Sequence, residues 1–110
     1  MASDALGLMQ GTVDVLILKT LSSGPRHGYA ISRWIRERSE GALLVEDAAL
    51  YQALHRLERK GCVESEWGVS DANRRARFYA ITADGRRALR SSVTDIRTYV
   101  DALLRVLAPA

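Results

Sequence analysis

The stretch DAALYQALHRLERKGCVESEW, residues 47–67, contains the clearest secondary-structure signals in the chain. Its apolar side chains recur at the spacing of a helix with one buried face: Leu50, Ala53, Leu54 and Leu57. Asp47 is a candidate N-cap, and Gly61 suits the first position after a helix end. We therefore predict a helix over about Asp47–Lys60 and a strand over Cys62–Trp67.

A second strand and a long helix are expected downstream of this stretch. Residues 68–76 contain Gly, Ser, Asp and Asn, which are typical of a loop, and Arg77–Ile81 reads as a strand that completes a hairpin. Thr82 is a candidate N-cap for a final helix that runs to about Leu107, and Pro109 lies just beyond it.

Two more helices and a short strand are expected upstream. Apolar residues at helical spacing predict a helix over Thr12–Ser23, which ends in the breaker cluster SSGP at residues 22–25. A second helix is predicted over about Tyr29–Ser39, and Gly41 ends it. The short apolar run Ala42–Val45 is interpreted as a brief strand.

The order of these elements indicates the fold class. Three helices followed by a hairpin are typical of a winged helix-turn-helix, whose third helix enters the DNA major groove. A chain of 110 residues has the length of one domain. We predict a mainly α (α+β) protein, in which a winged helix-turn-helix over residues 1–81 and a dimerisation helix over residues 82–110 form one compact unit.

The solvent-facing side of the helix over residues 47–60 carries groups suited to base edges. Glutamine pairs with adenine and arginine with guanine in the major groove. An exposed helix face without a function in recognition is the alternative. The candidate DNA-binding residues of this helix are Ala49, Tyr51, Gln52, His55, Arg56 and Arg59.

The hairpin loop is a second candidate DNA contact. It carries Asn73, Arg74, Arg75 and Arg77, which suit phosphate contacts or insertion into the minor groove. Glu64 and Glu66 on the preceding strand are expected to neutralise these arginines in part. The alternative is a solvated loop.

The net charge is concentrated in the same region. The chain has a formal charge of +3, and residues 1–46 and 91–110 each balance to zero. Residues 47–90 hold nine basic and six acidic side chains and so carry the whole excess. Positive charge in the part expected to face nucleic acid favours DNA as a partner.

The final helix carries a heptad pattern. Its apolar residues are spaced 4, 3, 4, 3 and 4 positions apart: Leu89, Val93, Ile96, Val100, Leu103 and Leu107. Such a seam predicts a two-stranded pairing and hence a homodimer. A helix that covers the core of its own domain needs the same periodicity and remains the alternative.

Several classes of protein are excluded by what the sequence lacks. Cys62 is the single cysteine, so neither an internal disulfide nor a cysteine-based zinc site can form. His27 and His55 have no companions at metal-ligand spacing, and the common catalytic motifs are missing. Residues 1–10 show no secretory signal, and no apolar run is long enough to span a membrane. We expect a cytoplasmic protein without a catalytic site, metal, cofactor or membrane association.

Three stretches together resemble the PadR family of bacterial transcriptional regulators, in its short form with a single C-terminal helix. They are GTVDVLILKTLSSGPRHGYAI (11–31), ALYQALHRLERKGCVESEWG (49–68) and DANRRARFYAITADGRRAL (71–89). The resemblance implies homodimerisation through the C-terminal helix. The two-fold symmetry of such a dimer predicts a pseudo-palindromic operator. The resemblance also implies repression that a small-molecule or stress signal relieves.

The resemblance assigns roles to particular positions. It places Tyr51 and His55 on the recognition helix. It places Arg74, Arg75 and Arg77 on the hairpin, which is the wing of a winged helix, and His27–Tyr29 in a structural turn. The family pattern commonly reads GSLYPAL, whereas this chain has Ala48, Ala49 and Gln52, so its operator is expected to differ. These departures leave a second hypothesis open, a winged-helix module that binds proteins and not DNA.

The final helix also departs from some members of the family. It lacks the tryptophan with which some relatives stack flat aromatic ligands between subunits, and Tyr99 is its single aromatic residue. This departure argues against an effector in the groove between subunits.

Overall fold

Four helices and three strands make up residues 2–109, the part of the chain that the computed structural model describes, with side chains described from residue 11 onward. They succeed one another as α1 (Ala2–Leu21), β1 (Arg26–His27), α2 (Gly28–Arg38), α3 (Asp47–Arg59), β2 (Val63–Val69), β3 (Arg75–Ile81) and α4 (Ala83–Leu107). The three strands form one antiparallel sheet in the order β1-β3-β2. This is the winged helix-turn-helix that the element order predicts.

The core lies where α1, α2 and α3 meet the base of the sheet. The predicted apolar face of α3 is confirmed, because all four of its residues are almost fully buried. Fully burying one large aliphatic side chain stabilises a fold by about 1.5–3 kcal/mol. The largest buried side chains come from all three helices and the sheet: Ile17, Leu21, Ile31, Ile35, Leu50, Leu54 and Val63.

One predicted strand is wrong. Residues 42–46 form no strand, and Leu43 and Leu44 are exposed. The backbone N–H of Leu43 donates to the Ser39 hydroxyl, and the Val45 carbonyl accepts from the Ser32 hydroxyl. Side chains at α2 and its C-cap therefore take the hydrogen bonds that a neighbouring strand would make. The strand that does pair with the hairpin is β1, which is too short to produce an alternating pattern.

The hairpin is longer than the sequence predicts. Its strands extend to Val69 and from Arg75, because Gly68 pairs with Ala76 instead of opening the loop. A Cβ on Gly68 would lie 2.9 Å from the Phe78 ring, so the glycine allows that ring to cover the strand. The loop is reduced to residues 70–74.

One helix start and one N-cap differ from the predictions. The first helix begins at Ala2, well upstream of the predicted Thr12, because residues 2–10 are rich in alanine, leucine and methionine, which favour helix. Glu46, not Asp47, is the N-cap of α3, and its side chain makes no capping hydrogen bond.

The other helix ends carry the expected signals. Gly61 has the positive φ of 76° expected of a residue that ends a helix. Thr82 caps α4 as predicted, since its hydroxyl accepts from the Gly85 N–H at 3.0 Å.

Thr82 and Gly85 also attach α4 to the domain. The Thr82 hydroxyl donates to the Gly61 carbonyl at 2.6 Å, and its N–H donates to the Cys62 carbonyl at 3.0 Å. Gly85 is buried against the same carbonyl of Cys62, and a Cβ on Gly85 would overlap that oxygen. The start of α4 is therefore fixed by a close backbone contact that only glycine allows.

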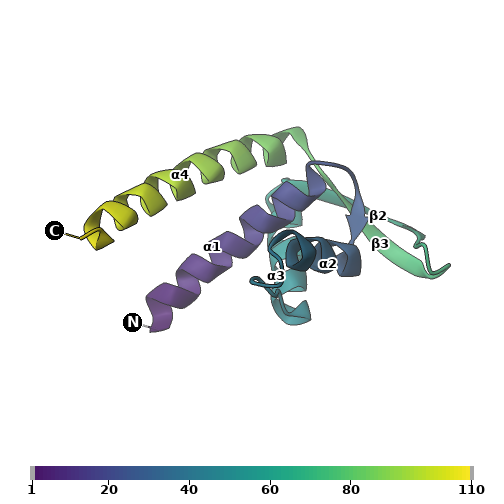
Figure 1. Ribbon diagram of the computed structural model, residues 1–110. Helices are drawn as coiled ribbons and strands as arrows, with labels where there is room; N and C mark the ends of the chain where they lie inside the picture. The colour runs from purple at the N-terminus through teal and green to yellow at the C-terminus, as the bar shows by residue number, and fades with distance from the viewer. Residues whose placement is uncertain (1, 110) are drawn as a thin grey trace.

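Beyond this attachment α4 leaves the core. Ala88 and Leu89 still pack against it, whereas Val100, Leu103 and Leu107 are exposed. Figure 1 shows α4 and α1 projecting to one side of the molecule and the hairpin of β2 and β3 to the other. The chain is accordingly elongated, with extents of 56 × 28 × 25 Å.

Gly85→Ala is expected to destabilise the protein by about 1–3 kcal/mol, because the added methyl group must displace backbone. Gly11→Ala is the matched control, since Gly11 is also helical but a Cβ at this position would have nothing within 4 Å. Helix propensity alone favours alanine at both sites by about 1 kcal/mol. Denaturant unfolding that shows the same sign for both variants would contradict the close contact at Gly85.

Candidate nucleic-acid interface

The solvent side of α3 presents most of the predicted recognition residues together. Burial of the opposite face leaves five of the six candidates exposed at the surface: Ala49, Tyr51, Gln52, His55 and Arg59. Tyr51, His55 and Arg59 line a hollow of about 680 Å³ that also reaches Arg77 and Tyr79 of the hairpin. The recognition side of α3 and the base of the hairpin thus face the same space.

Tyr51 connects α3 to the start of α2. A Cβ on Gly28 would lie 2.5 Å from the Tyr51 hydroxyl, so the glycine makes room for this ring. The neighbouring His27 caps α2, because its Nδ1 accepts from the Ala30 N–H at 3.2 Å. His27 and Gly28 have the structural roles that the resemblance implies.

Arg56 lies apart from the other candidates. Its guanidinium donates to the Asp14 carboxylate of α1 at 2.8 Å, and both side chains are partly buried. This contact turns Arg56 toward the body of the protein. The five exposed residues of α3 remain the candidates for the interface.

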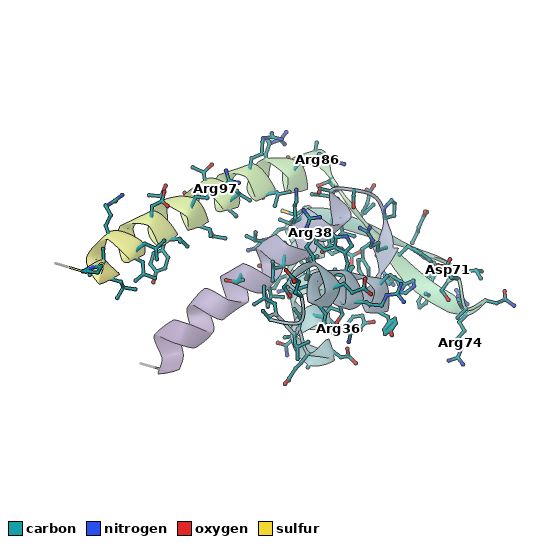
Figure 2. The ribbon with its side chains drawn as sticks, viewed as in Figure 1. Arg36, Arg38, Asp71, Arg74, Arg86 and Arg97 are labelled. Carbon is teal, nitrogen blue, oxygen red and sulfur yellow. The ribbon has the colours of Figure 1, made fainter. Side chains whose placement is uncertain are left out.

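The tip of the hairpin is a tight, well-bonded turn. The Ser70 N–H donates to the Arg74 carbonyl at 2.8 Å, and the Asn73 N–H donates to the Ser70 carbonyl at 2.9 Å. Asn73 has a positive φ of 58°, a conformation that asparagine tolerates. Its role in the loop is therefore to make the turn, while Arg74 is displayed at the far end of the wing (Figure 2).

The other two arginines of the wing lie beside Trp67. The guanidinium of Arg75 lies 4.7 Å from the centre of the Trp67 ring, and that of Arg77 lies 5.7 Å from it. Trp67 is 56% exposed. Cation–π contacts of this kind order the two long side chains along one face of the hairpin.

Strand pairing separates the acidic and basic side chains of the hairpin. Trp67 pairs with Arg77, whereas Glu66 pairs with Phe78. Because successive side chains alternate between the faces of a strand, Glu64 and Glu66 lie on the face opposite to the arginines. The expected partial neutralisation is therefore reduced, and one face of the wing is basic and aromatic.

A second hollow, of about 690 Å³, lies between this basic face and the start of α2. Tyr29 and Arg33 of α2 line it opposite Trp67 and Arg75, and the Arg33 guanidinium lies 5.8 Å from the centre of the Tyr29 ring. The resemblance assigns Tyr29 to a structural turn, but its side chain is 63% exposed and lines this hollow, so we add it to the candidates. Arg33 and Trp67 are further candidates that the sequence analysis did not name. Tyr29 and Arg33 could have been found from their i, i+4 spacing, which places them on one side of α2. Trp67 can be identified only from the strand register, which places it on the same face as Arg75 and Arg77.

The buried Tyr79 lines both hollows. Tyr79 is 7% exposed and pairs with Ser65 across the sheet. Burial raises the pKa of its phenol, with a smaller opposing effect from the Arg77 guanidinium. The ring therefore stays neutral at ordinary pH.

Among the residues that the structure describes, no group of acidic, histidine or cysteine side chains is placed to hold a metal ion. No helix in the same part of the chain is apolar enough over sufficient length to cross a membrane.

Comparison with known proteins agrees with this geometry. A model of the transcriptional regulator PadR-like family matches residues 17–91, which include α2, α3 and the whole hairpin. The chain belongs to the PadR-like family. An uncharacterised protein of Lysinibacillus sphaericus is 31% identical over 104 residues, which are 91% of this chain and 94% of that protein. PadR-like proteins are transcriptional regulators and not enzymes, in line with the missing catalytic motifs.

Solved structures share the PadR-like architecture over nearly the whole chain. A transcriptional regulator from Clostridium thermocellum has a TM-score of 0.84 at 26% identity, and the match covers 93% of this chain and 99% of that one. A PadR family regulator from Eggerthella lenta has a TM-score of 0.79 at 28% identity, with coverage of 99% and 93%.

Arg56→Gln is expected to lower the free energy of unfolding by about 1 kcal/mol, because the variant removes a partly buried, charge-assisted hydrogen bond. Asp14→Asn should cost a similar amount, and the double variant should cost less than the sum of the two single variants. Urea unfolding measures all three. A change in the salt dependence of DNA binding in Arg56→Gln would instead show that this guanidinium contacts DNA.

Proposed function

We propose that this PadR-like chain is a sequence-specific DNA-binding repressor that acts as a homodimer on a pseudo-palindromic operator. The observation that carries the proposal is that the exposed side of α3, the start of α2 and the basic face of the hairpin line adjoining hollows. A winged helix uses these same surfaces for the major groove, the DNA backbone and the minor groove.

The residues divide by the contacts that their chemistry suits. Gln52, His55 and Arg59 are exposed on α3 and offer groups that pair with base edges. Arg74 and Arg75 lie at the end of the wing and suit phosphate contacts, which position a protein on DNA without reading its sequence. Tyr29 and Arg33 of α2 line the other side of the hollow, where they suit a contact with the sugar-phosphate backbone of DNA.

The homodimer is supported by the surface of α4. A large apolar face lies open toward the end of the helix, and it continues the predicted heptad seam. Large exposed apolar patches of this kind mark interaction sites. Its members are Tyr99, Val100, Leu103, Leu104, Val106 and Leu107.

The two halves of the seam differ in what they contact. Leu89 packs against the core of its own domain, and Val93 and Ile96 are partly covered. Val100, Leu103 and Leu107 are exposed and are therefore the residues that pair with a second subunit in this proposal. We propose that residues 82–110 serve as the dimerisation helix of a DNA-binding domain at residues 1–81, and that a small-molecule or stress signal releases the operator.

The DNA-binding proposal is tested on the upstream DNA of the gene that encodes the chain. A dimer that makes about 6–10 phosphate contacts should lose about 10³–10⁵ in affinity between 50 and 200 mM salt. Arg75→Ala should weaken binding to every sequence alike, whereas Gln52→Ala should relax the preference at particular base pairs. Fluorescence anisotropy with operator and random duplexes measures both. Equal binding to the two duplexes at every salt concentration, with a stoichiometric protein partner on purification, would favour the protein-binding module instead.

The dimer is tested by Val100→Asp, which places a charge within the exposed seam. Sedimentation equilibrium of the wild-type protein at micromolar concentration should give twice the monomer mass of 12.2 kDa, and the variant should give the monomer mass. Thr98→Asp is the control, because residue 98 is exposed on the opposite side of α4. A monomeric wild-type protein would contradict the seam.

A further inference from the structure

We propose that Glu58, Ser65 and Arg77 form a hydrogen-bonded bridge that holds the wing in place against α3 before DNA is bound. The bridge itself is a property of the free protein. Its consequence for operator binding rests on the proposed function. In this arrangement Arg77 is a positioning residue for the wing and not a phosphate contact.

The bridge joins three elements through one hydroxyl group. The Ser65 hydroxyl on β2 donates to Oε2 of Glu58 on α3 at 2.7 Å, and it accepts from Nε of Arg77 on β3 at 2.8 Å. A terminal nitrogen of Arg77 also lies 3.7 Å from the same Glu58 oxygen. The serine uses its donor and an acceptor site, so both contacts are made at once.

Surrounding groups hold Arg77 in this orientation. Its guanidinium lies against the ring of Trp67, and Tyr79 is buried close by on the same strand face. The side chains of Arg77 and Glu58 are 44% and 35% exposed, so the ion pair alone is screened by solvent and weak. The hydroxyl is therefore the decisive member, because it gives the pair a fixed geometry.

The position of the bridge gives it a role in recognition. Glu58 and Arg77 line the same hollow as His55 and Arg59 of α3. A wing that is held at this point reaches the DNA at a set distance from α3. Because the wing is already ordered in the free protein, it loses less conformational entropy on binding than a mobile wing would. Arg74 lies beyond the bridge at the exposed end of the wing (Figure 2), and Arg75 is the first residue of β3 next to it. Both are exposed, so their guanidinium groups can reach the phosphates.

The test replaces Ser65 by threonine in one variant and by valine in another, because these two side chains have almost the same shape as each other. Ser65→Thr keeps the hydroxyl and Ser65→Val removes it, and both residues suit a strand. In the free protein, amide hydrogen exchange over residues 65–77 should be about five-fold faster in Ser65→Val than in Ser65→Thr, the effect of removing one hydrogen bond. Equal exchange in the two variants, at a rate close to the wild-type one, would overturn the bridge whether or not the chain binds DNA.

Operator binding gives the second measurement. Ser65→Val should bind about five-fold more weakly per subunit than Ser65→Thr, with the same dependence on salt. Arg77→Gln should likewise leave the slope of log K against log salt unchanged. Arg75→Gln is the matched control, and its slope should be shallower by about 0.9 for each phosphate that the arginine neutralises. A slope for Arg77→Gln that is as shallow as that of Arg75→Gln would overturn the proposal, since Arg77 would then bind a phosphate.

Discussion

Burial of one face of α3 governs most other features of the molecule. Leu50, Ala53, Leu54 and Leu57 are between 0% and 3% exposed and join α3 to α1, α2 and the base of the sheet. Because a helix turns by a fixed angle per residue, burying these four side chains determines which residues face solvent. The exposed side of α3 is therefore a consequence of core packing, and Arg56 falls at its edge, close enough to α1 to bind Asp14.

Two glycines allow the close contacts that orient the neighbouring elements. Gly28 admits the Tyr51 ring between α2 and α3, and Gly85 lets the start of α4 rest on the Cys62 carbonyl. The two contacts differ in kind. A side chain can move to relieve the first, whereas the second involves backbone and allows little adjustment. The direction of α4, and with it the position of its exposed apolar residues relative to α1, α2 and α3, is set at Gly85.

The wing shows how strand pairing sorts charge. The strands β2 and β3 have acidic and basic residues close together in sequence, but alternation places Glu64 and Glu66 on the face opposite to Arg75 and Arg77. The basic face turns toward α2 and α3, where Trp67 and the arginines line a hollow with Tyr29 and Arg33. Three arginines that look equivalent in the sequence thus differ in the structure. Arg74 is at the tip, Arg75 lies on Trp67, and Arg77 is bonded to Ser65.

Local signals in the sequence were sufficient for several elements: the third helix with its Gly61 terminus, the Thr82 cap, the hairpin and the winged helix-turn-helix order. Helical periodicity and caps act over a few residues and can be recognised without a partner. The folded chain was needed for the pairing of β1, the irregular backbone at residues 42–46, the ion pair of Arg56 and the hydrogen bond between Arg77 and Ser65. Each of these depends on residues outside the local segment, since a strand needs a neighbour for its hydrogen bonds and an arginine binds whichever carboxylate the fold brings near.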